Sequence, residues 1–363
     1  MTIRSMILLC MAVIFITVCY VKAEEQPCAR RIIDVIIAPS QSETIYSQID
    51  EIDLKQNNNT IYKSLDAGKS WRSISYLRDG YRGLVVDPKD SRIIYAGLIF
   101  KSIDSGKTWN GIQLAPTIID PKNTAIMYSL GSWTNIRKST DGGISWTSLK
   151  GDWKSCNAIA LAPQNPQILY ASCQGGASEG IFKSINAGVT WNMVLPAMII
   201  ADLAVDPNNS EIVYAGTRFR GVYRSMDGGK QWHAVNNGLP TGKPSMPWHW
   251  AHEMERALRN GETVHKPITR LAIDPIQSNT LYVLTESGVF KSTDAGINWR
   301  GINKGLRLGA VRALTIDPKN PDIIYIGTSK EGIFKSIDGG ENWVSSNNGI
   351  SCGPTDSNRP VGH

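Results

Sequence analysis

Short apolar runs alternate with turn-forming residues along this chain. Near the C-terminal end, one run covers 311–316 and is followed by Asp317-Pro318, a second covers 323–328, and a third covers 332–336 before Trp343. Runs rich in Ile, Val, Tyr and Phe that are bounded by Asp-Pro, Gly and Asn are typical of β-strands. A fourth strand begins at the tryptophan, so the pattern predicts a unit of four short strands.

The unit is repeated, and the phrase Ser-x-Asp-x-Gly-x-x-Trp marks each copy. The seven copies begin at Ser64, Ser102, Ser139, Ser184, Ser225, Ser292 and Ser336. Self-similarity at a period of roughly 40 residues indicates a repeat architecture. Four strands per unit and seven units, with no helical periodicity between them, predict an all-β fold, a seven-bladed β-propeller of four-stranded antiparallel blades.

The phrase itself is expected to form the hairpin between the third and fourth strands of each blade. Its acidic position is occupied by Asp66, Asp104, Asp141, Asn186, Asp227, Asp294 and Asp338. A carboxylate or amide oxygen there can accept hydrogen bonds from the turn's own backbone, and the glycine allows a positive φ. We interpret these residues as structural, because seven equivalent positions around a ring cannot all be an active site.

The phrase and its sevenfold repetition resemble the Asp-box, or BNR, repeat. The resemblance covers the whole chain after its first residues and implies the propeller fold. Relatives include sialidases, sortilin-like receptors and the assembly factors of photosystem II, so the fold does not fix the function. Sialidases also need an arginine triad, a Tyr–Glu pair and a Phe-Arg-Ile-Pro motif. That motif is absent, which disfavours a glycoside hydrolase, and we expect no catalytic residues in this chain.

The N-terminal segment predicts export. Residues 1–23 combine a basic start, an apolar run and a small residue at 23, as in a signal peptide, with an uncleaved anchor as the alternative. We therefore expect a leader at 1–23, a propeller at 24–352 and a tail at 353–363, with no membrane span in the mature chain. The formal charge of +6 falls to +4 without Arg4 and Lys22, which is too mild to indicate nucleic acid.

Four cysteines follow the predicted leader, and an even number in an exported protein suggests disulfides. Cys156 and Cys173 flank a hairpin and face each other if Leu161 faces Ile168. Cys28 precedes the first blade and Cys352 follows the last, so a Cys28–Cys352 bridge would clasp the ring. No Cys-x-x-Cys-His motif occurs, so we expect no covalently bound haem, and the cysteines lack zinc-finger spacing.

Four of the 11 tryptophans lie outside the repeated phrase: Trp133, Trp153, Trp248 and Trp250. All four fall in loops between the second and third strands or between blades, which share one face of a propeller. Aromatic residues on loops favour interfaces, so we predict partner contacts there. Covering blade edges is the alternative for Trp133 and Trp153.

The loop that enters blade six holds an insertion at 240–266. Pro247 and Gly261 bracket good helix formers, which predicts a helix of about three turns. His249, His252, Glu253 and Arg256 fall on one side of it. We expect this insertion to bind a partner; a lid over the channel, a neutral elaboration and a metal site are the alternatives, and we assign no metal.

The leader, the single propeller without haem motifs and the His/Trp-rich insertion together resemble the propeller subunits of hydrazine synthase, the multihaem enzyme of anaerobic ammonium-oxidising (anammox) bacteria. The resemblance implies a non-catalytic subunit of an oxidoreductase that makes hydrazine from nitric oxide and ammonium. It also implies partner subunits that carry haem c and a location in the anammoxosome lumen. The alternative is an exported, periplasmic assembly or binding propeller similar to the photosystem II assembly factors.

Overall fold

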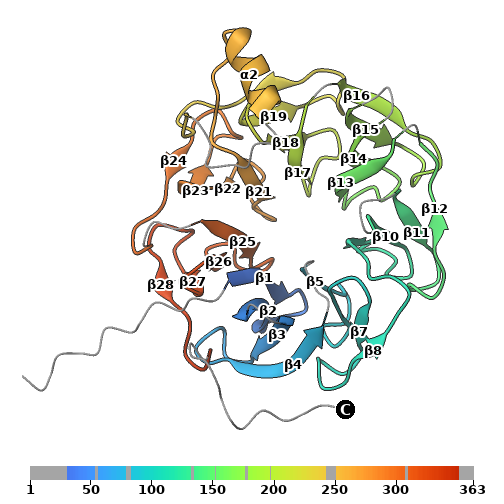
Figure 1. Cartoon of the computed structure of the whole chain (residues 1–363), viewed down its shortest axis with the longest axis vertical. Coiled ribbons are helices and arrows are strands. Elements are labelled where there is room, and N and C mark those ends of the chain that lie inside the picture. The colour runs from blue at the N-terminus through green and yellow to red at the C-terminus, as the bar shows by residue number, and fades with distance from the viewer. Residues whose placement is uncertain are drawn as a thin grey trace, which may run out of the picture. The chain divides into compact units, whose positions relative to one another are not determined.

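Seven four-stranded antiparallel sheets form the blades of a propeller (Figure 1). The computed structural model describes residues 31–350 except 54–55, 79–82, 132–134, 152, 176–178, 197, 243–250 and 307–309. Blades one to seven are β1–β4, β5–β8, β9–β12, β13–β16, β17–β20, β21–β24 and β25–β28. The predicted fold class is therefore confirmed, and each blade takes its four strands from one continuous segment.

Strand position determines burial. The innermost strands are β1 (Arg31–Ala38), β5 (Leu84–Val86), β9 (Ile118–Ile119), β13 (Ser155–Leu161), β17 (Ile200–Val205), β21 (Ile268–Ile273) and β25 (Val311–Ile316). The second strands are β2 (Gln41–Asp53), β6 (Ile94–Ala96), β10 (Met127–Ser129), β14 (Leu169–Gln174), β18 (Val213–Thr217), β22 (Leu281–Thr285) and β26 (Ile324–Thr328). Several second strands are buried at every residue, because neighbouring blades cover both faces; this explains their continuous apolar runs.

In most blades the two outer strands are together shorter than the two inner ones, and the fourth strand is exposed. The third strands are β3 (Gln56–Ser64), β7 (Phe100–Ser102), β11 (Arg137–Ser139), β15 (Gly180–Ser184), β19 (Val222–Ser225), β23 (Gly288–Ser292) and β27 (Ile333–Ser336). The fourth strands are β4 (Arg72–Arg78), β8 (Asn110–Gly111), β12 (Thr147–Ser148), β16 (Asn192–Pro196), β20 (His233–Ala234), β24 (Arg300–Gly301) and β28 (Val344–Ser345). The repeated phrase forms the turn between these strands, which we call the box turn.

The first box turn shows how the repeated residues act. The Ser64 hydroxyl donates to Asp66 Oδ1 at 2.8 Å and accepts from the Gly68 N–H at 2.8 Å. The Ser70 N–H donates to the same carboxylate at 2.9 Å, and the Ser70 hydroxyl also donates to it, which lowers the pKa of Asp66 to about 2. In the fourth box turn Asn186 Oδ1 accepts the equivalent backbone bond at 2.9 Å. The acidic position thus organises its own turn.

A basic side chain on the third strand links most blades to the next box turn. Five lysine ammonium groups lie over a tyrosine ring of their own blade and donate to a backbone carbonyl of the following box turn: Lys63, Lys138, Lys183, Lys291 and Lys335. Arg224 makes the corresponding bond in blade five. Each lysine link places a cation over an aromatic face while its hydrogen bond to the backbone is satisfied.

Blade seven closes on blade one through the same kind of contact. The Lys335 ammonium and the Tyr325 hydroxyl both donate to the Ala67 carbonyl, at 2.9 Å and 2.7 Å. The Trp71 N–H donates to the Asn348 carbonyl at 2.8 Å. The ring is therefore closed by non-covalent contacts within the described residues, and the expected Cys28–Cys352 bridge lies outside them.

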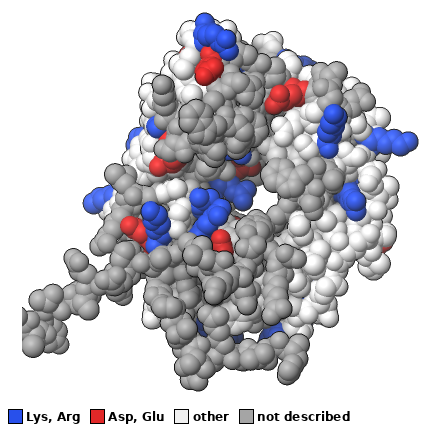
Figure 2. Space-filling model, in the orientation of Figure 1, with Lys and Arg blue, Asp and Glu red and all other residues white. Residues whose placement is uncertain are grey.

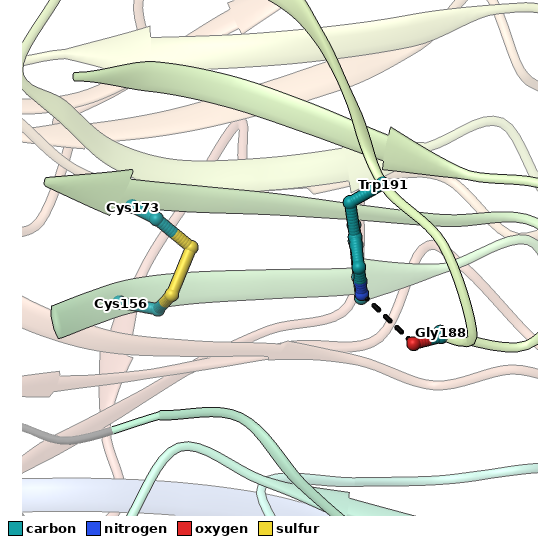
Figure 3. Close-up of a disulfide and its surroundings, with 4 residues drawn as sticks. All are labelled: Cys156, Cys173, Gly188 and Trp191. Carbon is teal, nitrogen blue, oxygen red and sulfur yellow. Dashed lines mark hydrogen bonds between the residues drawn. A yellow bond between two sulfur atoms is a disulfide. The ribbon is translucent and has the colours of Figure 1, made fainter. Parts of the chain in front are cut away.

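A disulfide joins Cys156 on β13 to Cys173 on β14, as the hairpin predicted (Figure 3). The register around it differs from the expected one, because Leu161 faces Leu169 and not Ile168. A bulge at Asn157 shifts the pairing by one residue and brings the two cysteines opposite each other.

Candidate functional site

The innermost strands surround a central channel that holds a cavity of about 1050 Å³. Figure 2 shows lysine and arginine side chains gathered beside the opening at the centre of the ring. Loops between second and third strands and loops between blades lie on one face, which also carries the insertion; we call it the insertion face. The box turns lie on the opposite face.

A repeated bulge sets the side chains that enter the channel. In blades one, four, five, six and seven, the innermost strand shifts register near its start. The residues just after the shift are Asp34, Ala158, Asp202, Arg270 and Ala313. Three of these equivalent positions are charged, and all three charged residues line the cavity.

The two aspartates connect neighbouring blades. Asp34 accepts the Leu84 N–H of blade two, and Asp202 accepts the Leu271 N–H of blade six, each at 2.9 Å. Each carboxylate also accepts the N–H of the residue that follows it. Burial raises the pKa of both carboxyl groups, and the positive charge of Arg270 opposes that rise.

Arg270 supplies the charge between the two aspartates. Burial alone would lower the pKa of its guanidinium, but the carboxylates of Asp202 and Asp34 raise it further than burial lowers it. The side chain is enclosed by the channel walls, yet much of it faces the open space of the channel. The group is therefore an ionic cluster that water can reach.

Replacing Arg270 with methionine is expected to lower the free energy of unfolding by about 1–3 kcal/mol, less than for a dry buried pair. The raised pKa values of Asp34 and Asp202 mean that the folded chain binds more protons than the unfolded chain just above pH 3.8. Their ionisation therefore costs stability as the pH rises through that window. Urea unfolding should show a larger loss at neutral pH than at mildly acidic pH.

The matched control adds Asp34→Asn and Asp202→Asn to Arg270→Met. Without the two negative charges, the stability difference between this triple variant and the Asp34→Asn/Asp202→Asn double variant should not depend on pH. An Arg270→Met variant whose loss of stability is the same at both pH values would contradict the ionic cluster.

The channel mouth at the insertion face is rich in cations. Arg31 and Arg312 come from the starts of β1 and β25, and Arg218 follows β18. Glu286 follows β22 and pairs with Lys266 at 2.7 Å. Arginine guanidinium groups are planar donors that suit oxyanions.

Trp153 requires a correction to the predicted partner surface. Its side chain is only 6% exposed and packs between Phe182 and Trp191. The loop entering blade four turns inward, because the gap between blades three and four offers its ring a buried aromatic site. Trp153 is therefore a core residue, as the blade-edge alternative had it.

The other predicted contact residues fall largely outside the described structure. Trp133, Trp248, His249 and Trp250 lie outside the described residues. His252, Glu253 and Arg256 lie on helix α2 (Ala251–Arg259), of which only the backbone is described at these three positions. The predicted helix is present, and its described part has nine residues.

The base of the insertion is fixed to blade five. The Arg220 guanidinium pairs with Glu262 at 2.5 Å, and the His265 N–H donates to the Phe219 carbonyl at 2.8 Å. Thr241 and His265 form a β-bridge between the two ends of the insertion. His265 is buried, and burial lowers its pKa. The insertion is thus held on its own propeller at both ends.

Helix α2 shows one buried and one exposed side. Ala257 is buried against the loop that contains Phe219, whereas Leu258 is 48% exposed and Glu255 and Arg259 are exposed. Figure 1 shows the helix at the rim of the ring beside β19. The exposed side carries both charges and an apolar residue, a composition that suits contact with a protein.

Sequence reasoning missed the charged channel. The signal was present in the repeats, where Asp34, Asp202 and Arg270 stand at a position that is alanine in blades four and seven. Charged side chains at the start of an innermost strand are not explained by strand packing. Aligning the units on their Asp-Pro turns would have exposed this difference.

Within the described residues, no group of three or more His, Cys, Asp or Glu side chains is placed to hold a metal ion. No described helix is long and apolar enough to cross a bilayer.

No protein family model matches the chain. A xyloglucanase of Hypocrea jecorina (strain QM6a) is 32% identical over 128 residues, which are 31% of this chain and 15% of that enzyme. A xyloglucanase of Paenibacillus sp is 28% identical over 206 residues, 53% of this chain and 18% of that enzyme. The chain therefore spans less than a fifth of the length of these curated relatives.

Solved structures show the same architecture. A GH74 xyloglucanase from Xanthomonas campestris has a TM-score of 0.58 at 18% identity, covering 86% of this chain and 60% of that one. YCF48 bound to D1 peptide has a TM-score of 0.54 at 12% identity, covering 86% and 93%. YCF48 from Cyanidioschyzon merolae has a TM-score of 0.54 at 11% identity, covering 86% and 96%. Identities this low show a common fold and nothing finer.

Proposed function

We propose that this chain is a non-catalytic, exported propeller that binds a partner protein through its insertion face and holds it in a larger assembly. The anchored insertion carries the proposal. It is tied to blade five by the Arg220–Glu262 ion pair and by the bridge between Thr241 and His265. It therefore presents the exposed side of α2 from a fixed base, and a fixed base lowers the ordering cost of binding.

The comparisons support a binding role more than a hydrolytic one. The YCF48 likeness covers 93% of a chain that is bound to a peptide in its structure. The xyloglucanase likeness covers 60% of the solved GH74 chain and at most 18% of the curated enzymes, so part of each enzyme is left unmatched. Asp34 and Asp202, the aspartates that line the channel, are occupied by two backbone N–H groups each.

The finer hypothesis makes the partners haem c-bearing subunits of hydrazine synthase, with the assembly in the anammoxosome lumen. None of the relatives described above is a hydrazine synthase subunit, so this identity stays a prediction. The His/Trp-rich insertion favours it over a generic periplasmic binding propeller. A Soret band in the purified assembly, carried by other chains, distinguishes the two.

The test shortens the insertion without disturbing its base. Residues 243–260 are replaced by a short Gly-Ser loop, which keeps Glu262, Thr241 and His265. The tagged chain is purified from its native host, and the stoichiometry of co-purifying subunits is measured. We expect the wild type to retain a stoichiometric partner and the shortened chain to lose it, with an unchanged circular dichroism spectrum.

Two point variants provide the matched comparison. Leu258→Asp places a charge on the exposed side of α2, and Ile337→Asp places one at a box turn where the side chain is 70% exposed. Only Leu258→Asp should weaken partner retention. Full retention by the shortened chain contradicts the proposal, as does xyloglucan hydrolysis by the purified chain alone.

A further inference from the structure

Two arginines lie on neighbouring strands at the seam of the ring. Arg31 is the first residue of β1 and Arg312 the second residue of β25, and these innermost strands of blades one and seven are neighbours. Both side chains line the mouth of the central cavity. The pKa of Arg312 is lowered by burial and by the positive charge of Arg31, so the two cations repel each other.

Neighbouring groups satisfy these cations only in part. Arg312 Nε donates to the Ser329 hydroxyl at 2.7 Å. Arg31 lies 3.9 Å from Asp50, beyond hydrogen-bonding distance, and its buried Nε has no hydrogen-bond partner among the described residues. The Arg31 side chain as a whole is 42% exposed and lines the cavity, so a bound acceptor can reach it.

The acidic groups of the channel have other partners. Asp34 and Asp202 accept backbone N–H groups and face Arg270. Glu286 pairs with Lys266 at 2.7 Å. The guanidinium groups at the mouth therefore dominate its potential, and Arg218 adds a third positive charge to the lining.

We propose that the channel mouth at Arg31 and Arg312 binds a carboxylate-bearing ligand, either a free dicarboxylate or the acidic side chains of a partner segment. Guanidinium groups bind carboxylates through paired hydrogen bonds. An anion between Arg31 and Arg312 would remove their mutual repulsion. A cavity of about 1050 Å³ accommodates a ligand of either kind. Binding of a partner segment rests on the proposed function, whereas binding of a free dicarboxylate is independent of it.

Calorimetry on the isolated full chain tests the site. The probes are succinate, a hexaglutamate peptide, and a hexaglutamine peptide as the uncharged control. We expect succinate or hexaglutamate to bind and hexaglutamine not to. Arg31→Gln or Arg312→Gln should weaken binding about tenfold or more, and added salt should weaken wild-type binding.

Arg92→Gln is the matched control, because Arg92 is exposed on the opposite face and pairs with Asp90. It removes the same charge and should leave the affinity unchanged. Without ligand, Arg312→Gln should be at least as stable as wild type, which a merely structural arginine would not be. If hexaglutamate binds more tightly than succinate, the ligand is a protein segment. If succinate binds more tightly, the ligand is a free dicarboxylate.

The absence of binding by both carboxylate probes overturns the proposal. So does binding that Arg31→Gln, Arg312→Gln and Arg92→Gln leave equally intact. Because the isolated chain is titrated with defined probes, these outcomes are separate from the partner-retention experiment. A negative partner-retention experiment does not contradict the dicarboxylate site, and a negative calorimetry experiment does not contradict the insertion contact.

Discussion

Replacing Trp153 with alanine is expected to lower the free energy of unfolding by about 3–5 kcal/mol, the range for removing a large buried aromatic side chain. The ring centroid of Trp153 lies 5.0 Å from that of Phe182 and 5.6 Å from that of Trp191, both edge-on. Alanine would remove both contacts and open a cavity between blades three and four. Urea unfolding followed by circular dichroism measures the change.

Trp153→Phe is the graded control. It keeps an aromatic ring, and it sacrifices no hydrogen bond because Trp153 Nε1 has no partner among the described residues. Its cost should stay below about 2 kcal/mol. If Trp153→Ala instead unfolds at the wild-type urea concentration but loses its partner, Trp153 is a surface anchor after all.

Removing the disulfide should have the next largest effect. The double substitution Cys156→Ala and Cys173→Ala is expected to cost about 3 kcal/mol, since a bridge across 17 residues restricts the unfolded chain. Both cysteines are buried in the core that contains Trp153. Alanine leaves no unpaired polar group there. The urea midpoint of the variant, compared with wild type, measures the loss.

Reductant gives an independent check. Wild type in dithiothreitol should approach the stability of the double variant, because both then lack the Cys156–Cys173 bridge. A variant as stable as oxidised wild type would mean that the pairing of β13 with β14 needs no covalent support.

The repeated phrase was sufficient to predict the fold because each of its seven copies encodes one local turn, and each turn marks one blade. Ser64 bonds both Asp66 and Gly68 within five residues, so sequence spacing alone reveals them. The Cys156–Cys173 pair was found for a similar reason, since a hairpin links its two residues. The bulge at Asn157 was not foreseen, because the strand is apolar at nearly every position from Cys156 to Leu161 and has no alternation that would reveal a one-residue shift.

The candidate site was predictable only in part, because its residues come from different blades. Asp34, Asp202 and Arg270 are brought together by the ring, which no local pattern encodes. Trp153 was assigned to the correct loop, but its side chain was predicted to be exposed and is buried. A loop residue's burial depends on the shape of the space between two blades, and the sequence of one blade does not specify that space.

The seam between blades seven and one determines when folding can finish. Its bonds join residues that are 258 to 279 positions apart, from Tyr325 to Ala67 and from Asn348 to Lys69. Contacts of such high sequence separation carry the full entropy of loop closure and slow the folding of a domain. The face of blade one that packs against blade seven therefore stays uncovered until the strands of blade seven have been synthesised and folded. During that interval the uncovered face is prone to aggregation, and chaperones would have to protect it.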